Sequence, residues 1–75
     1  MEETKDQWIS FYVKKGKYLT ELSENHYKNK EYRKALELLN QAYNMFKKGN
    51  APELAEETKQ KFSEIKAKHF KKKEE

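Results

Sequence analysis

Hydrophobic residues recur at helical spacing in three segments, which short polar breaks separate. In the first segment, Trp8, Tyr12, Leu19 and His26 fall within ~40° of one another on a helical wheel. Other apolar residues flank this line, with Phe11, Tyr18 and Leu22 on one side and Ile9, Val13 and Tyr27 on the other. The segment predicts a helix over about residues 5–28, whose apolar arc is wider than one neighbouring helix covers.

Local signals suggest where this first helix begins and ends. Thr4-Lys5-Asp6-Gln7 has the form of a capping box, so we expect the helix to start at Thr4. Asn29 tolerates the left-handed conformation that often follows a helix, and we expect it there. Gly16 is unfavourable inside a helix. It indicates a close approach of another helix, a tolerated cost in stability, or a break that divides the helix near Lys15.

The second segment predicts a helix over about residues 30–48. One stripe follows the i, i+3, i+4, i+7 pattern and contains Tyr32, Ala35, Leu36, Leu39, Ala42, Tyr43 and Phe46. Leu38 and Met45 lie to one side of this stripe and widen the apolar arc to ~180°. We therefore expect this helix to contact two neighbours, and we expect Gly49 to take the left-handed position after it.

The third segment predicts a helix over about residues 51–70, with Asn50 as the cap and Pro52 in the first turn. Its apolar face contains Leu54, Ala55, Thr58, Phe62, Ile65 and His69. The basic tail, residues 71–75, is expected to fray. Connections this short force successive helices to run antiparallel. The sequence thus predicts a single all-α domain over residues 1–75, an up-down-up antiparallel three-helix bundle.

Composition agrees with a small helical domain and excludes several kinds of chemistry. Among the 75 residues, 40% are charged, but the aromatic content of 13% is too high for a disordered chain. Cysteine is absent, and neither His26 nor His69 has a histidine four residues away, so a zinc site lacks ligands. No nucleophile motif or carboxylate pair stands out, and a bundle this small should lack a ligand pocket of ~300 Å³ or more. We predict a non-enzyme without catalytic residues, metal or cofactor.

The stretch from Glu24 to Phe46 has the pattern of a known helical hairpin. One helix closes on the aromatic Tyr27, a polar turn follows, and the chain continues as Tyr-x-x-Ala-Leu-x-x-Leu-x-x-Ala from Tyr32 to Ala42. This pattern resembles both the microtubule-interacting-and-transport (MIT) domain and the tetratricopeptide repeat. A single tetratricopeptide unit cannot bury its own core. Three helices without a second repeat are more similar to the MIT domain.

The resemblance implies a protein-interaction module that binds a short helical segment of a partner, of the kind found in membrane-remodelling (ESCRT-type) proteins. The ligand groove is then expected between the second and third helices. An apolar strip with cationic edges suits an amphipathic helix with acidic flanks. The expected groove residues are Lys34, Leu38, Gln41, Met45, Lys61, Ile65 and Lys68. Leu38 and Met45 also fit plain packing against the third helix.

Two further kinds of partner stay open. The formal net charge is +4, and residues 30–48 hold five basic against two acidic residues, so a nucleic acid or another anionic surface is the alternative partner. The surplus of aromatic residues in the first helix leaves room for self-association. No apolar run approaches the ~18 residues that a membrane-spanning helix needs, so we expect a cytoplasmic protein.

Overall fold

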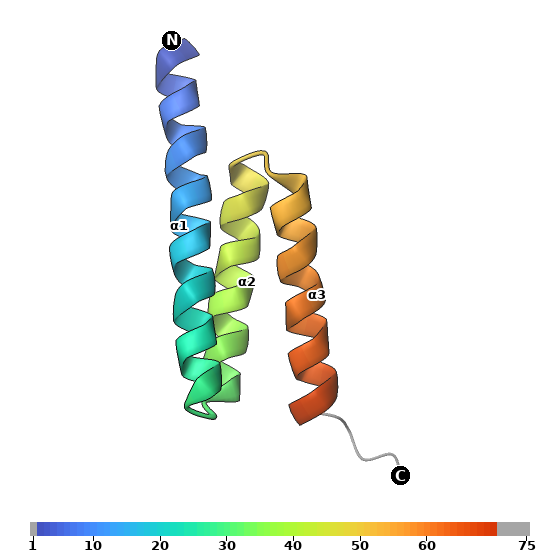
Figure 1. The fold of residues 1–75 in the computed structure, drawn as a ribbon. Coiled ribbons are helices and arrows are strands. Elements are labelled where there is room, and N and C mark those ends of the chain that lie inside the picture. Colours follow the sequence, from blue (N-terminus) through green and yellow to red (C-terminus); the bar gives the residue numbers. More distant parts are fainter. Residues whose placement is uncertain (1, 71–75) are drawn as a thin grey trace.

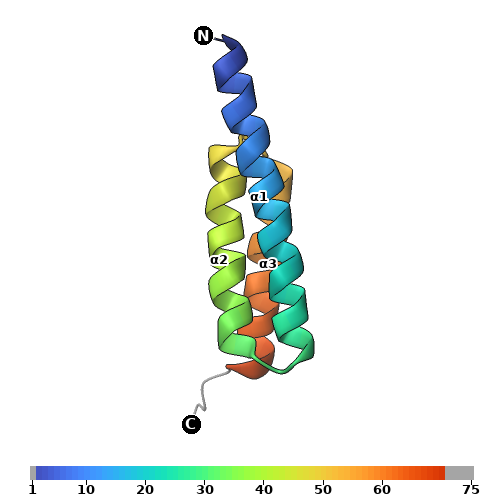
Figure 2. The ribbon, with the colours of Figure 1, turned by 90° about the vertical axis from the view of Figure 1, so that its left-hand side faces the viewer.

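The structure, a computed structural model, describes the backbone of residues 2–70 and the side-chain surroundings of residues 7–70. Three helices follow one another as α1 (Glu2–Lys28), α2 (Tyr32–Lys48) and α3 (Pro52–His69). They run up, down and up, with α2 between the other two in Figure 1 and α3 behind the α1–α2 pair in Figure 2. The predicted all-α, antiparallel three-helix bundle is confirmed.

The helix α1 is the longest element. It has 27 residues against 17 in α2 and 18 in α3, and its N-terminal end projects beyond both of them (Figure 2). It begins at Glu2, ahead of the expected start at Thr4, because no glycine or proline precedes Thr4 and glutamates suit the positive end of the helix dipole. The capping side chain of Thr4 and the basic tail 71–75 lie outside the described residues.

The turn between α1 and α2 is a Schellman motif. The N–H of Glu31 donates to the carbonyl of His26 (2.8 Å) and the N–H of Lys30 to that of Tyr27 (2.9 Å). Lys30 holds the left-handed position, with φ of 64°. The prediction that Asn29 takes this position is wrong, because Asn29 continues the last turn of α1 and its N–H bonds to the carbonyls of Asn25 and His26.

The turn between α2 and α3 repeats this geometry. The N–H of Ala51 donates to the carbonyl of Phe46 (2.9 Å), and Asn50 is left-handed with φ of 56°. Gly49 has φ of −84°, so its predicted left-handed role is wrong. The predicted cap is wrong too, because Ala51 occupies the cap position without a side-chain hydrogen bond and Asn50 lies outside the helix. Pro52 starts α3, as expected.

Both glycines lie where α1 and α2 come close together. A β-carbon on Gly16 would lie 2.6 Å from Cε1 of the buried Phe46 ring. A β-carbon on Gly49 would lie 2.7 Å from Cγ2 of Val13 and 3.2 Å from the carbonyl oxygen of Ile9. The close-approach interpretation of Gly16 is confirmed, and α1 runs through it without a break. Gly49 is therefore required by packing and not by its backbone conformation.

The core is centred on α2. Its buried residues are Ala35, Leu38, Leu39, Ala42 and Phe46. From the neighbours, Leu19 and Ser23 of α1 and Ala55 and Thr58 of α3 are buried as well. The prediction that α2 contacts two neighbours is confirmed, since it packs along both α1 and α3, whereas these two make few direct contacts with each other.

The buried face of α1 differs from the predicted one. Trp8, expected on the core-facing line, is 54% exposed, whereas Gly16 and Ser23 are buried. Counting ~100° per residue, the covered face is rotated by roughly 40° from the predicted line. The physical reason is the close approach of α2, which small side chains permit and large aromatic rings prevent.

Candidate functional site

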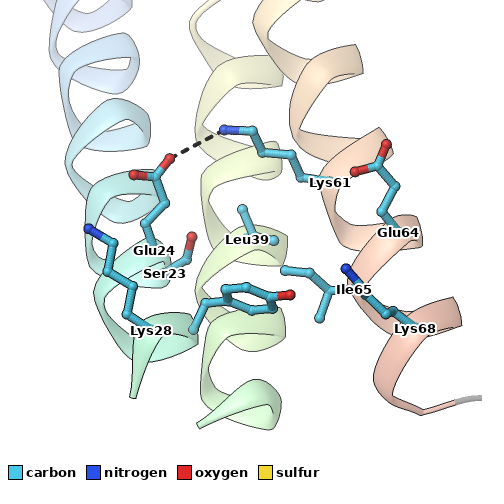
Figure 3. A pocket seen from close by; sticks show the side chains of 9 residues that line it. Ser23, Glu24, Lys28, Leu39, Lys61, Glu64, Ile65 and Lys68 are labelled. Carbon is cyan, nitrogen blue, oxygen red and sulfur yellow. Dashed lines mark hydrogen bonds and ion pairs between the residues drawn. The ribbon is translucent and has the colours of Figure 1, made fainter. Parts of the chain in front are cut away.

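An open cleft lies between α1 and α3, because both helices pack on α2 and not on each other. Figure 3 shows it from close by, with α2 at its floor. Its volume is about 300 Å³. The expectation that the bundle lacks a space of this size is therefore wrong. The lining residues are Ser23, Glu24, Tyr27 and Lys28 of α1, Leu39 of α2, and Lys61, Glu64, Ile65 and Lys68 of α3.

The floor of the cleft is mostly apolar. Leu39 points into it from α2 and is 1% exposed, while Tyr27 and Ile65 are partly buried on either side. The one polar group at the bottom, the hydroxyl of Ser23, donates to the carbonyl oxygen of Thr20 at 2.7 Å. Since this hydroxyl is satisfied within α1, the floor offers contact surface for an apolar group and no activated nucleophile.

Charged side chains form the rim. Lys61 Nζ donates to Glu24 Oε2 across the cleft at 3.4 Å (Figure 3). Lys28 and Lys68 stand on the α1 and α3 sides, and Glu64 adds a second carboxylate. Three lysines against two glutamates give the rim a formal charge of +1. The Lys61–Glu24 pair is about half exposed on both sides, so it contributes little to stability and opens at little cost.

An aromatic cluster joins the ends of the three helices beside the cleft. The imidazole of His69 stacks on the ring of Tyr32, with centroids 3.7 Å apart and planes 9° apart. The hydroxyl of Tyr27 and Nε2 of His69 share a hydrogen bond of 3.0 Å. His26, on the core-facing line of the wheel, is partly buried, and its Nδ1 contacts the Glu31 carboxylate. Both histidines thus contact other side chains at the end of the bundle where α1 turns into α2.

The structure brings together only some of the expected groove residues. Lys61, Ile65 and Lys68 line the cleft, but it faces α1 and not the outer side of α2. Leu38 is 7% exposed and belongs to the core cluster with Leu19 of α1, so it packs in the core, but not only against the third helix as the packing alternative proposed. The wheel placed Leu38 correctly to one side of the α2 stripe, but the neighbour on that side is α1.

The other three expected groove residues lie on separate surfaces. Gln41 and Met45 border a shallow groove between α2 and α1, opposite Lys15 and Leu19. Lys34 lies near the α1–α2 turn, in a hollow with Lys30, Arg33 and Phe70 among its lining residues. Two hollows lie between α2 and α3. One, of about 320 Å³, is at the α2–α3 turn, and the other, of about 170 Å³, is lined by Leu39, Asn40, Tyr43, Thr58, Lys59 and Phe62.

The α1 side of the cleft was missed in the sequence. Ser23 and Tyr27 are four residues apart and therefore share a helix face, and both lie on the C-terminal half of α1. The sequence does contain a signal for the α1 wall of the cleft. The apolar arc of α2 spans ~180°, so α2 must have two neighbours on different sides, and these are α1 and α3. The cleft between those neighbours follows from that arrangement.

The basic residues of the segment 30–48 do not form one patch. Arg33 and Lys34 lie in the first turn of α2, and Lys47 and Lys48 lie in its last turn. At 1.5 Å per residue these groups are roughly 20 Å apart along the helix. Glu31 and Glu37 share the hollow near Lys34. The number of basic residues in this segment favours a nucleic-acid partner, but their separation along α2 favours it less. A nucleic-acid partner stays a prediction.

Comparisons with known protein families, curated proteins and solved structures find no significant match to this chain. Within residues 2–70 no helix is long and apolar enough to cross a membrane. The same described part of the chain holds no group of three or more His, Asp or Glu side chains placed to bind a metal ion.

Proposed function

We propose that the chain is a protein-interaction module that binds a short segment of a partner protein in the cleft between α1 and α3. The observation that carries this proposal is an open apolar cleft with lysines on both of its edges. The segment that fits has apolar residues toward Tyr27 and Ile65 and acidic residues at its flanks. This differs from the groove expected between α2 and α3, while the class of partner is the same.

The shape of the cleft suits a helical ligand. The α1 and α3 walls run in the same direction and stand apart over the floor of α2 (Figure 3). From Lys61 to Lys68 the α3 wall is about two helical turns long, or roughly 10 Å. A ligand helix in this position packs as a fourth helix on Tyr27 and Ile65, which are only partly buried, and presents residues at i, i+3 and i+4 to the floor.

The charges on the rim set the expected ligand chemistry. A ligand carboxylate replaces the exposed Glu24 as the partner of Lys61. Lys28 and Lys68 can each pair with a further acidic group of the ligand. Exposed ion pairs contribute about 0.2–1 kcal/mol each, so the affinity comes mainly from the buried apolar side chains. A ligand with two buried leucines should bind with a dissociation constant on the order of 100 μM, after the cost of association.

The biological setting follows only from the resemblance. The hairpin from Glu24 to Phe46 is similar to that of MIT domains, and α3 completes the three helices that such a domain has. On that basis we propose that the partner belongs to the membrane-remodelling or trafficking machinery, as ESCRT-type proteins do.

The proposal is tested by titrating the isotope-labelled chain with a synthetic amphipathic helix of ~15 residues that carries two leucines and glutamate flanks, and by following the backbone amide shifts. We expect the largest shifts at Ser23, Tyr27, Lys61 and Ile65. Shifts centred on Asn40 and Tyr43 would place the ligand between α2 and α3 instead. A chain without saturable shifts up to ~1 mM peptide contradicts the proposed module.

Two matched variants of α3 sharpen this titration. Lys68→Glu reverses a charge at the edge of the cleft and should weaken binding several-fold, because it repels the acidic flanks. Lys59→Glu makes the same change on the α2–α3 hollow and should leave the affinity nearly unchanged. If both variants weaken binding equally, the peptide is attracted by the net charge of the chain and does not bind specifically in the cleft.

A further inference from the structure

A second surface of α1 is exposed and lies outside the cleft. Trp8, Phe11 and Tyr18 are 54%, 49% and 59% exposed, and none of them lines the cleft. The rings of Trp8 and Phe11 meet edge to face, with centroids 5.8 Å apart. Three large aromatic side chains on one face of one helix form an apolar surface of the kind that marks an interaction site.

These residues belong to a regular seam along α1. The positions Trp8, Phe11, Lys15, Tyr18 and Leu22 follow spacings of three and four residues in alternation, the a and d positions of a coiled coil. One edge of the seam meets the shallow groove in which Gln41 and Met45 of α2 lie opposite Lys15 and Leu19. The other edge carries Lys14 and Glu21, both exposed and seven residues apart.

We propose that this outer face of α1 joins two copies of the chain, with their α1 helices antiparallel about a two-fold axis that crosses the seam between Lys15 and Tyr18. In this register Phe11 packs on Leu22 of the second copy, and Tyr18 lies against Lys15 of the second copy. Phe11 and Leu22 then cover one another, each lysine ammonium meets a ring face, and Trp8 lies opposite Asn25 of the second copy.

The charges beside the seam favour a second copy of this chain as the partner, and they favour one alignment of the two helices. Lys14 and Glu21 occupy equivalent flanking positions, so the antiparallel pair places Lys14 of each copy beside Glu21 of the other and forms two ion pairs. A shift by one heptad toward the N-terminus places Lys14 against Lys14 of the second copy, which repels. The seam therefore complements itself in one antiparallel alignment.

The available area sets the strength of this contact. A large aromatic side chain buries about 150–250 Å² when it is fully covered, so three half-exposed rings leave roughly 300 Å² per chain. With the flanking residues the two copies bury about 1,000 Å² in total, at the low end for a specific interface. The dimer should dissociate at concentrations on the order of 100 μM.

Sedimentation velocity of the parent chain and of charge variants tests the proposal. The parent should pass from monomer to dimer between ~10 μM and ~1 mM. Lys14→Glu and Glu21→Lys should each weaken the dimer about tenfold, because each turns two ion pairs into two repulsions. An equal mixture of these two variants should recover the dimer, since every Lys–Glu pair forms again in the heterodimer.

Lys17→Glu is the matched control, because it makes the same charge change on α1 at an exposed position outside the seam. It should dimerise as the parent does. A parent chain that stays monomeric up to ~1 mM overturns the proposal. So does a mixture of the Lys14→Glu and Glu21→Lys chains that stays as weak as its components. Neither result bears on the cleft, which shares no residue with the seam.

Discussion

One face of α1 is covered by α2, whereas the outer face, which carries the larger rings, is open. The covered face presents Gly16, Leu19 and Ser23, and all three are buried. The open face presents Trp8 and Tyr18, both more than half exposed. The comparison teaches that the size of side chains, and not hydrophobicity alone, decides which face a neighbouring helix takes. The covered face should therefore govern stability and the open face recognition.

The largest effect is expected where α2 packs against its neighbours. Ala42 is fully buried in the core cluster, so Ala42→Leu adds carbon atoms where no space exists. Overpacking costs about 1–3 kcal/mol, which lowers the melting temperature by roughly ten degrees in a domain of this size. Thermal melts of the variant and the parent measure the difference.

The control for this substitution lies on the same helix. Glu37 is exposed, and Glu37→Ala should change the free energy of unfolding by no more than ~0.5 kcal/mol. If Ala42→Leu melts at the temperature of the parent, Ala42 is not enclosed between α2 and its neighbours.

A smaller effect is expected on the covered face of α1 itself. Gly16→Ala gains about 1 kcal/mol of helix propensity but places a methyl group against the ring of Phe46, at an overpacking cost of ~1–3 kcal/mol. The net loss should be about 1 kcal/mol by urea denaturation. In a Phe46→Leu background the same change should stabilise the chain, because the ring is gone. A stabilised Gly16→Ala single variant would show that α1 and α2 lie farther apart.

The number, order and direction of the helices could be predicted from the sequence, and so could most of the core of α2. Ala35, Leu39, Ala42 and Phe46 lie on the predicted stripe and are all buried. Hydrophobic periodicity was sufficient there because α2 has neighbours on two sides. The apolar arc of α2 is wide enough for two neighbouring helices, and its regularly spaced small residues let them approach.

The covered face of α1 and the turn residues could not be predicted in the same way. The wheel weighted Trp8 above Gly16, although the glycine is the residue that lets α2 approach. At the second turn the best left-handed residue, Gly49, is needed beside Val13, so Asn50 takes that conformation. In both places a contact between distant segments overrides a local preference.

The cleft depends on how α1 and α3 are placed relative to each other, and a helical wheel describes only one helix at a time. Its floor residue Leu39 lay on the predicted stripe, and Ile65 lay on the predicted face of α3. Ser23 and Tyr27 join them only because α1 and α3 diverge over α2. Of the expected groove residues, Lys61, Ile65 and Lys68 line this cleft, whereas those expected on α2 lie on other surfaces or in the core.

The free energy of unfolding of the triple variant Trp8→Ala, Phe11→Ala, Tyr18→Ala tests the division of α1 most directly. It is measured by urea denaturation at ~10 μM, where the chain is monomeric. The parent and the variant should agree within about 1 kcal/mol, because the rings are half exposed and alanine favours the helix. A loss of ~4 kcal/mol or more, as for aromatic residues in a core, would contradict the open face.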